Sequence, residues 1–231
     1  MYRYALTIEY DGSPFHGWQV QNNIATVQGV IFDAIKRLDM NCENFVGAGR
    51  TDAGVHAIGQ VAHVDLATKR DCETVQKAIN YYLNKYPVSI LNARLVNNQF
   101  HARFSAIKRH YIYKIFSRKT DLTFEKNQYW HVRHRLNKSD MQLAANYLTG
   151  KHDFSAFRSS ICQSSSPIKT IDTISIQSEE IRDGVVYQLN FSARSFLHHQ
   201  VRSIVGCLEK VGCGKWGAKK IQEIISVSYT H

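Results

Sequence analysis

The sequence lacks the features that would mark a secreted or membrane-bound protein. No stretch of the 231 residues approaches the roughly 20 apolar residues that a membrane-spanning helix needs. The first nine residues resemble a strand, and their apolar run is too short for a signal peptide. The five cysteines are scattered and include no C-x-x-C pair (Cys42, Cys72, Cys162, Cys207 and Cys213). We therefore expect a cytoplasmic protein, kept in a reducing environment, that does not bind a membrane.

Motifs for nucleotide cofactors, structural metals and common nucleophiles are missing as well. There is no Walker sequence, and Gly47-Ala-Gly49 lacks the third glycine of a dinucleotide-binding loop because Asp52 stands in its place. His131-x-x-His134 and His198-His199 have no companion ligands at the spacing of a structural zinc site. A hydrolase with a serine or cysteine nucleophile finds little support, because no G-x-S-x-G occurs and no cysteine lies in a glycine-rich turn. The sequence predicts neither a cofactor nor a metal.

Positive charge, in contrast, is abundant. Lysine and arginine number 29 against 19 acidic residues, which gives a net charge of +10 and a pI near 9.4. The excess is concentrated between His101 and Arg135, where aromatic residues are interleaved with nine basic ones (Arg103, Lys108, Arg109, Lys114, Arg118, Lys119, Lys126, Arg133 and Arg135). Basic side chains suit phosphates and aromatic rings suit unstacked bases, so the pattern indicates a nucleic-acid partner. The alternative is a solvated strand face whose aromatic residues lie in the core, and about half of these residues fit it because alternate strand positions face inward.

The first half of the chain predicts the order strand, helix, strand, strand, helix, strand. Alternating apolar residues predict a strand over 2–10, and helical spacing after a Thr26 N-cap predicts a helix through Leu38. The remaining elements are strands near Glu43–Gly49 and Gly59–Leu66, a helix that Asp71 caps, and a strand over Ser89–Val96. This order is that of a ferredoxin-like unit, which RNA-recognition modules use.

The second half repeats much of this order. The predicted elements are a strand over His110–Ser117, a helix over Asp140–Leu148 that Gly150 stops, a hairpin of Ile168–Gln177 and Val185–Ala193 across Asp183-Gly184, and a helix through Val201 and Val211. We expect an α+β fold of two ferredoxin-like, RRM-like halves, with domains at 1–105 and 106–231. Their strands are expected to join into a mostly antiparallel central sheet, with helices on one side and a basic cleft on the other.

The segment Gly49-Arg-Thr-Asp-Ala-Gly-Val55 is the most informative part of the sequence. Residues two apart in an extended segment point to the same face, so Arg50 and Asp52 are expected to share one side of a strand end. Gly49 and Gly54 permit the backbone to turn sharply around them. A nearby guanidinium keeps a carboxylate ionised and aimed, as a nucleophile requires. The alternative is a surface turn with an ordinary ion pair, worth roughly 0–1 kcal/mol.

Several segments, in the same order, resemble the tRNA pseudouridine synthase A family. The first resemblance is the loop itself, Gly47-Ala-Gly-Arg-Thr-Asp-Ala-Gly-Val-His-Ala57. The others are Tyr10-Asp-Gly with Gly17-Trp-Gln19, Phe100-His-Ala-Arg-Phe-Ser-Ala106, Arg109-His-Tyr111, His152-Asp-Phe with Phe157-Arg158, and Phe196-Leu-His-His-Gln-Val-Arg-Ser-Ile-Val-Gly206. The similarity is collinear from Tyr4 to about Gly212.

The resemblance implies an enzyme that converts uridine into pseudouridine at positions 38 to 40 of the tRNA anticodon stem-loop, without cofactor or metal. It implies that Asp52 is the catalytic nucleophile, that Tyr111 stacks on the target base and that Arg202 pairs with the Asp52 carboxylate. It also implies a homodimer in which one tRNA spans both subunits.

Further residues are expected to bind the RNA, and for several the sequence leaves a structural alternative open. His101 and Arg103 fit contact with phosphate, but Arg103 fits bracing of the Asp52 loop equally well. Arg50 is expected either to aim Asp52 or to bind phosphate. Tyr111 could instead be a core aromatic, although Arg109, two residues earlier on the same strand face, favours a cleft. Two more residues are expected to contact the substrate (Phe157 and Arg158).

One part of the family pattern is missing. After Gly212 the sequence predicts a single short helix near Ala218–Ile225 and no strand to close the second half. The family continues with a proline-containing loop, a Gly-Leu-Tyr-Leu-like segment that places an apolar residue against the target base, and a final strand. A natural end, an incomplete copy of the sequence or a frameshift would each explain the difference. The rival expectation is therefore an RNA-binding protein of the same fold with impaired catalysis.

Overall fold

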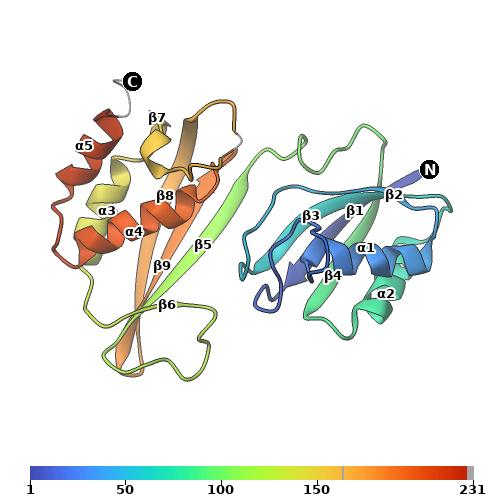
Figure 1. The fold of residues 1–231 in the computed structure, drawn as a ribbon, viewed down its shortest axis with the longest axis horizontal. Coiled ribbons are helices and arrows are strands. Elements are labelled where there is room, and N and C mark those ends of the chain that lie inside the picture. Colours follow the sequence, from blue (N-terminus) through green and yellow to red (C-terminus); the bar gives the residue numbers. More distant parts are fainter. Residues whose placement is uncertain (163, 228–231) are drawn as a thin grey trace. The chain divides into compact units, whose positions relative to one another are not determined.

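The computed structural model describes residues 1–162 and 164–227, and the chain divides after Ala106 into two compact units (Figure 1). Each unit has its own hydrophobic core. All five cysteines are free thiols. Among the described residues, no helix is both long enough and apolar enough to cross a bilayer.

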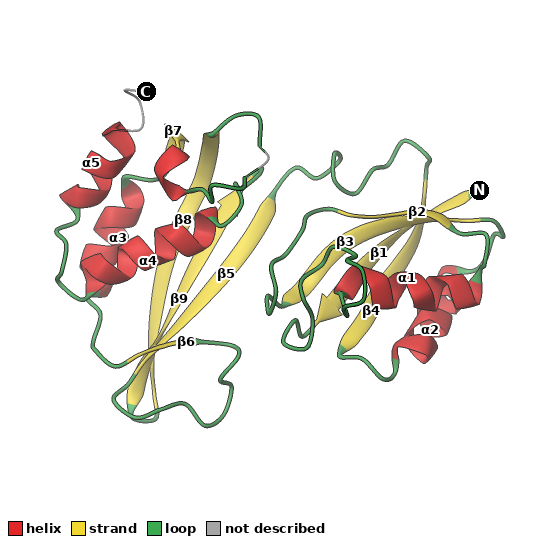
Figure 2. Cartoon of the chain, in the orientation of Figure 1, coloured by secondary structure: helices red, strands yellow, loops and turns green. Residues whose placement is uncertain are grey.

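The first unit is a four-stranded antiparallel sheet with two helices packed on one face (Figure 2). Its elements are β1 (Tyr2–Tyr10), α1 (Val27–Leu38), β2 (Glu43–Gly47), β3 (Ala57–Leu66), α2 (Cys72–Leu83) and β4 (Val88–Val96). The strands lie in the order β2-β3-β1-β4, and every pair is antiparallel. The predicted order of elements is confirmed, and it is the ferredoxin-like arrangement.

Local sequence explains where the helices of this unit begin. The Thr26 hydroxyl accepts a hydrogen bond from the Gly29 N–H at 3.3 Å, and α1 begins at the next residue. The Asp71 carboxylate accepts from two backbone N–H groups in the first turn of α2. Both predicted caps are therefore confirmed. Under these helices the apolar side chains of β1 are fully buried (Tyr4, Leu6 and Ile8).

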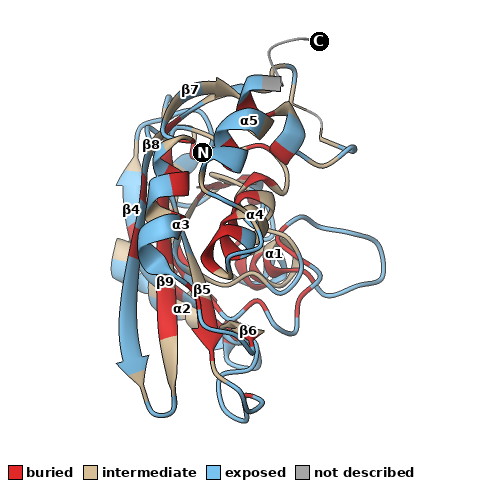
Figure 3. Cartoon of the chain, turned by 90° about the vertical axis from the view of Figure 1, so that its left-hand side faces the viewer, coloured by how far each residue is buried: buried red, intermediate tan, exposed pale blue. Residues whose placement is uncertain are grey.

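The second unit is a five-stranded sheet whose one face packs against three helices. Its elements are β5 (Arg109–Ser117), β6 (Trp130–Val132), α3 (Lys138–Asn146), β7 (Gly150–Asp153), a 3₁₀ turn η1 (Ser155–Phe157), β8 (Ile168–Ile181), β9 (Gly184–Ala193), α4 (Gln200–Gly212) and α5 (Lys219–Val227). The strand order is β6-β5-β9-β8-β7, in which only β6 runs parallel to its neighbour. On α5, buried Ile221 and Ile225 face the core while exposed residues cover the other side (Figure 3).

Two predicted boundaries in this unit are wrong. The third helix begins earlier than predicted because Asn137, not a later residue, caps it through the Ser139 and Asp140 N–H groups, and it ends at Asn146. Gly150 does not stop this helix directly, since it is the first residue of β7, with a φ of +102°.

The turn of the β8–β9 hairpin is also displaced by one residue. Ile181 pairs with Gly184, so Arg182 and Asp183 form the turn, and Arg182 has a φ of +57°. Gly184 belongs to β9, where a Cβ would lie 2.5 Å from the Ser117 carbonyl oxygen. The glycine is needed for this close approach to β5, not for the turn itself.

The hydrogen bonds among the described strands form two sheets, one in each unit. The α+β class is confirmed, whereas the joined central sheet and its basic cleft stay predictions. In the described part of the second unit no strand follows β9, and the β5 edge opposite β9 is paired only over Ile115–Ser117, by β6.

Candidate active site

The loop that carries Asp52 connects β2 to β3 and is fixed by hydrogen bonds at both ends. The Ala48 N–H donates to the Val61 carbonyl at 2.7 Å, and the Gln60 side chain donates to the Gly49 carbonyl at 2.7 Å. Beyond Asp52, the Val55 N–H donates to the Asp52 carbonyl at 3.2 Å and closes a turn. The start of the loop is thus held against β3, and a local turn closes the backbone after Asp52.

The segment after β1 holds the same loop from a second side. The Trp18 N–H donates to the Thr51 carbonyl at 3.0 Å, and the Gly54 N–H donates to the Phe15 carbonyl at 3.3 Å. The hydroxyls of Tyr10 and Thr51 lie 2.8 Å apart. Residues immediately before and shortly after Asp52 are therefore tied to the segment 10–18, which restricts where the carboxylate can be placed.

Two glycines allow this second segment to come so close. A Cβ on Gly17, whose φ is +93°, would lie 2.8 Å from the Thr51 carbonyl oxygen. A Cβ on Gly12 would lie 2.1 Å from the Val55 carbonyl oxygen. The glycines of the opening motif are thus required by the loop that they contact.

Arg50 is exposed at the start of the loop, and its two expected roles, aiming Asp52 or binding phosphate, stay predictions. Within the described residues no ion pair joins the two side chains, and Arg50 is exposed. The turn that Val55 closes begins at Asp52, so it does not lie between the two residues. Its exposure leaves the Arg50 guanidinium accessible to solvent.

A histidine and a carboxylate flank the loop. The His56 Nδ1 lies 2.9 Å from the Asp11 carboxylate and 3.1 Å from the Gly12 nitrogen. Hydrogen bonds from Ser13, with a smaller effect of His56, hold the pKa of Asp11 below its usual value. When Nδ1 carries a proton it can donate to Asp11, and when it does not it can accept from the Gly12 N–H.

The segment 97–104 lies on the face of the first sheet that the helices leave uncovered. Arg3 makes a bidentate ion pair with Asp65, with both N–O distances 2.7 Å, and its third nitrogen donates to the Asn98 and Phe100 carbonyls at 2.7 and 2.9 Å. Hydrogen bonds from Arg3 are the main cause that lowers the pKa of Asp65. The guanidinium thereby fastens the start of this segment to the sheet.

His63 fixes the next part of the segment. Its Nδ1 accepts from the Ala102 N–H at 3.2 Å, and burial, aided by the Arg3 charge, lowers the pKa of His63 to about 4. The neutral ring that results lies at a tilt to the His101 ring, which in turn lies near Phe104, with centroids 4.8 and 4.4 Å apart. His101 is thus partly enclosed, while the neighbouring Arg103 is exposed.

In the second unit, three predicted residues lie on β5 and α4. Tyr111 is half-buried against the core and contacts Phe196 edge-to-face, with ring centroids 5.2 Å apart. Arg109 donates a hydrogen bond to the Arg194 carbonyl. Arg202 lies in the first turn of α4, 3.4 Å from the His199 ring nitrogen. Tyr113 lies two residues after Tyr111 on β5. Burial raises the pKa of Tyr113, and the positive charge of Arg202 opposes this increase.

Phe157 must be removed from the residues expected to contact substrate. Its side chain is 1% exposed and packs in the core of the second unit, with its ring 6.1 Å from Phe154. The turn η1 directs this ring inward and leaves the next residue, Arg158, exposed. Of the two adjacent motif residues, Phe157 therefore packs in the core and Arg158 lies on the surface.

The comparisons with known proteins point to one family. The model of the tRNA pseudouridine synthase family matches residues 6–105 and 144–229, a range that includes Asp52 and Arg202 but not Tyr111. The chain belongs to the tRNA pseudouridine synthase family. Members of this family are isomerases that act on tRNA.

Several relatives of this chain carry the name tRNA pseudouridine synthase A. The protein from Maricaulis maris is 47% identical over 228 residues, which are 99% of this chain and 90% of the relative. The protein from Paracoccus denitrificans is 48% identical over 98% of this chain and 88% of the relative. The protein from Xanthobacter autotrophicus is 47% identical over 99% of this chain and 91% of the relative.

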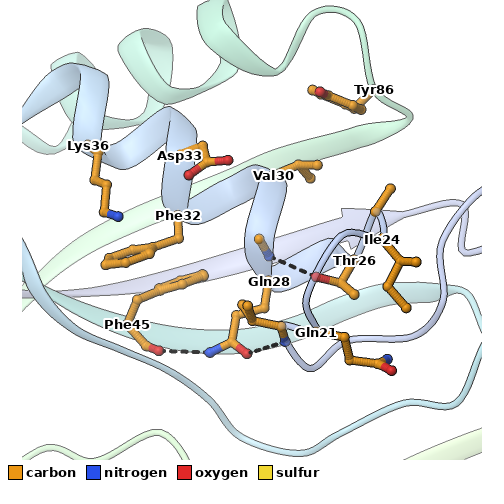
Figure 4. A pocket seen from close by; sticks show the side chains of 13 residues that line it. Gln21, Ile24, Thr26, Gln28, Val30, Phe32, Asp33, Lys36, Phe45 and Tyr86 are labelled. Carbon is orange, nitrogen blue, oxygen red and sulfur yellow. Dashed lines mark hydrogen bonds between the residues drawn. The ribbon is translucent and has the colours of Figure 1, made fainter.

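A pocket in the first unit of this synthase-family chain lies apart from the predicted site residues. It has a volume of about 610 Å³ and is lined by residues of α1, the preceding loop and β2, together with Tyr86 (Figure 4). The Phe32 and Phe45 rings stack in it, with centroids 6.0 Å apart, and Lys36 lies over Phe32. None of the predicted site residues lines it.

Sequence reasoning missed the residues that hold the site together. Arg3, His63 and Asp65 fix the segment around His101, and His56 with Asp11 flanks the Asp52 loop. Because side chains alternate along β1 and β3, Arg3, His63 and Asp65 lie on the sheet face opposite the core. This alternation is the sequence pattern from which their shared face could have been predicted. Their mutual pairing required the strand register, in which Arg3 lies opposite Asp65.

Proposed function

We propose that this protein isomerises uridine to pseudouridine at positions 38 to 40 of the tRNA anticodon stem-loop, with Asp52 as the catalytic carboxylate. The observation that carries the proposal is the support of the Asp52 loop by β2, β3 and the segment 10–18. A loop of this kind holds one carboxylate in a fixed position, and fixed position is what a nucleophile needs. Membership of the synthase family supports the same assignment.

The reaction itself requires little more than such a carboxylate and a means of turning the base. The bond from ribose C1′ to uracil N1 breaks, the uracil turns, and a new bond forms from C1′ to C5. The C5 proton is lost and N1 gains a proton, so atoms and electrons balance without a redox partner. Attack of Asp52 on C1′, attack on C6 and a glycal route all satisfy this balance.

Two residues of the second unit complete the proposed chemistry. Tyr111 stacks on the extruded uracil and accepts the C5 proton. Arg202 pairs with the Asp52 carboxylate and orients it. The edge contact with Phe196 supports this role for Tyr111, because it holds the ring at an angle while the side chain stays partly exposed.

Binding energy from the RNA backbone must supply the free energy needed to extrude the base. Taking a uridine out of a stem costs a few kcal/mol. We assign this task to exposed or partly exposed residues of the predicted motifs (Arg50, His101, Arg103, Arg109 and Arg158). Phosphate contacts by such residues are electrostatic and independent of sequence, so they can hold any tRNA whose stem fits. We further propose that the protein acts in the cytoplasm as a homodimer, with one tRNA contacting both subunits.

Release of tritium from tRNA labelled at uridine C5 tests the proposal. The full chain should release tritium, and Asp52→Asn and Asp52→Ala should release none while still binding tRNA. Asp33→Asn, an exposed aspartate on α1, is the matched control and should behave as wild type. A tRNA with cytidine at positions 38 to 40 should release no tritium.

Each other outcome contradicts part of the proposal. Release by Asp52→Asn at the wild-type rate would remove Asp52 from the chemistry. Release from the cytidine-substituted tRNA would place the target uridine elsewhere. No release by the wild-type chain, with salt-dependent tRNA binding intact, would leave the alternative of an RNA-binding protein of this fold.

A further inference from the structure

A histidine, a glutamate and a cysteine meet in the second unit, away from any residue assigned above. His134 follows β6, while Glu209 and Cys213 lie at the C-terminal end of α4. Figure 2 shows the two elements β6 and α4. The imidazole nitrogen, carboxylate oxygen and thiol sulfur all lie within 4.8 Å of one another. The His134 Nε2 and Glu209 Oε1 are 2.6 Å apart.

The helix presents two of the three groups together. Glu209 and Cys213 are four residues apart, so their side chains lie on the same face, one turn from each other. The Cys213 N–H donates to the Glu209 carbonyl at 2.9 Å, which fixes the end of the helix there. The C-terminal end of a helix carries partial negative charge and favours a cation.

The loop after β6 brings the third group to this helix end and is firmly held. Three hydrogen bonds fix it: the Ser117 hydroxyl to the His134 carbonyl at 2.6 Å, the Tyr187 hydroxyl to the Leu136 carbonyl at 2.6 Å, and the Asn137 N–H to the Gly212 carbonyl at 2.8 Å. Gly212 also packs against Met141 and Leu136 so closely that a Cβ there would clash. The histidine is therefore positioned by its backbone before any ligand binds.

The burial of Glu209 needs explanation. This residue is only 9% exposed, and its helix neighbours Leu208 and Val211 belong to the core. A carboxylate removed from water is stable only beside a cation or strong donors. An ion pair with His134 accounts for two of the three groups. The Cys213 thiol donates to the Lys210 carbonyl at 3.4 Å, and its sulfur also lies beside the other two groups, which a bound metal ion would explain.

We propose that His134, Glu209 and Cys213 bind one Zn²⁺ ion, with water as the fourth ligand. Imidazole, carboxylate and thiolate are the ligands that zinc takes in proteins, whereas Mg²⁺ and Ca²⁺ prefer oxygen alone. Binding releases the Cys213 thiol proton and any proton shared by His134 and Glu209 to solvent. The sequence predicts no metal because these ligands come from two distant segments and match no zinc spacing.

The geometry requires a small adjustment only. Metal–ligand distances of about 2.0–2.3 Å place neighbouring tetrahedral ligand atoms roughly 3.3–3.7 Å apart. The His134–Glu209 distance must therefore widen by about 1 Å. The His134 side chain is 44% exposed, so it has room to rotate outward and to admit the ion from solvent. Once bound, the ion would tie the loop 133–137 to the last turn of α4, the helix whose first turn carries Arg202.

Cobalt(II) is the probe that tests this site, because a thiolate bound to Co²⁺ gives a charge-transfer absorption in the near ultraviolet. Titration of the reduced full chain should give this band with a stoichiometry of one ion per chain, and Zn²⁺ should displace it. Cys213→Ser should abolish the band, and His134→Gln should weaken binding at least tenfold. Cys207→Ser, on the same helix, and Cys162→Ser are the matched controls and should keep it.

A second measurement guards against variants that fold poorly. Zn²⁺ should raise the melting temperature of the wild-type chain, because a ligand that binds the folded state stabilises it. The rise should disappear in a His134→Gln, Cys213→Ser double variant whose circular dichroism matches that of the wild type. Absence of the band in the wild type, its survival in Cys213→Ser, or an equal Zn²⁺ effect on both proteins would overturn the proposal and leave an ordinary ion pair.

Discussion

Gly12 and Val55 approach each other so closely that a Cβ on Gly12 would lie 2.1 Å from the Val55 carbonyl oxygen. Val55 closes the turn that begins at Asp52, and Gly12 follows β1. The contact therefore joins the opening motif of the chain to the proposed catalytic loop. Because the obstructing atom belongs to the backbone, no side-chain rotation can relieve a clash there.

We expect Gly12→Ala to reduce activity far more than it reduces tRNA binding. The methyl group must push the 52–55 turn away from its position, and a displacement of about 1 Å can lower a rate about 100-fold. The strain should also lower the free energy of unfolding by about 1–3 kcal/mol. Single-turnover tritium release and urea unfolding measure the two effects.

Gly59→Ala is the control for this substitution. Gly59 lies in β3 shortly after the loop, and nothing lies within 4 Å of a Cβ at this position. Its activity and stability should stay close to those of the wild type. If Gly12→Ala and Gly59→Ala had equal rates, the contact with Val55 would not position the Asp52 loop.

His63 should make the first unit unstable in mild acid. Its folded pKa of about 4 lies below the unfolded value near 6.5, so the unfolded chain binds more protons between these two values. Stability from His63 is therefore complete above about pH 6.5 and decreases as the pH falls toward 4. We expect a loss of about 2 kcal/mol by about pH 4.5, measured by urea unfolding across this range.

His63→Gln should remove most of that pH dependence, because the amide oxygen can still accept from the Ala102 N–H but does not titrate. The titration of Asp65 does not contribute to the change in stability between pH 4.5 and 6.5. Its folded pKa lies below 3.8, so its contribution is lost only at a lower pH. An unchanged slope between pH 4.5 and 6.5 in His63→Gln would show that other groups cause the acid sensitivity.

Removing the charge of Asp65 should destabilise the first unit strongly. Arg3 and Asp65 have side chains only 14% and 6% exposed, so Asp65→Asn would leave a guanidinium in a largely buried position. Breaking one partner of such a pair costs about 3 kcal/mol. Glu73→Gln, which breaks the exposed Lys77–Glu73 pair, should be indistinguishable from wild type in the same unfolding assay. Equal stabilities for the two variants would contradict the proposed importance of burial.

Features that depend on neighbouring residues were the ones that the sequence predicted well. Thr26 and Asp71 cap their helices as expected because a cap needs only the residue and the first turn that follows it. The strands of the first unit follow from the alternation of apolar residues. In the hairpin, by contrast, the turn was predicted at Asp183-Gly184 because glycine is common in turns. Gly184 is instead needed for its close approach to Ser117, which lies in another strand.

Features that depend on long-range packing were predicted less well. The motif identifies the Asp52 loop, but no sequence pattern predicts that Trp18 and Phe15 hold it through backbone hydrogen bonds. The expectation that Arg50 shares a face with Asp52 stays a prediction. His134 had no visible companions because Glu209 reaches it only through the packing of α4 against the loop after β6.

Phe157 and Arg158 provide the sharpest test of the proposed RNA-binding surface, because they are adjacent in sequence and opposite in environment. Arg158→Ala should leave the free energy of unfolding unchanged, since the side chain is exposed. It should weaken tRNA binding and reduce the slope of log affinity against log salt concentration by about 0.7–0.9, the contribution of one phosphate contact.

Phe157→Leu should instead lower the free energy of unfolding by about 1–2 kcal/mol and leave the salt slope unchanged, because the ring packs against Phe154 in the core. Filter binding across a salt series and urea unfolding of both variants separate the two roles. A lower salt slope in Phe157→Leu at full stability would return that residue to the RNA-binding surface, and an unchanged slope in Arg158→Ala would remove Arg158 from it.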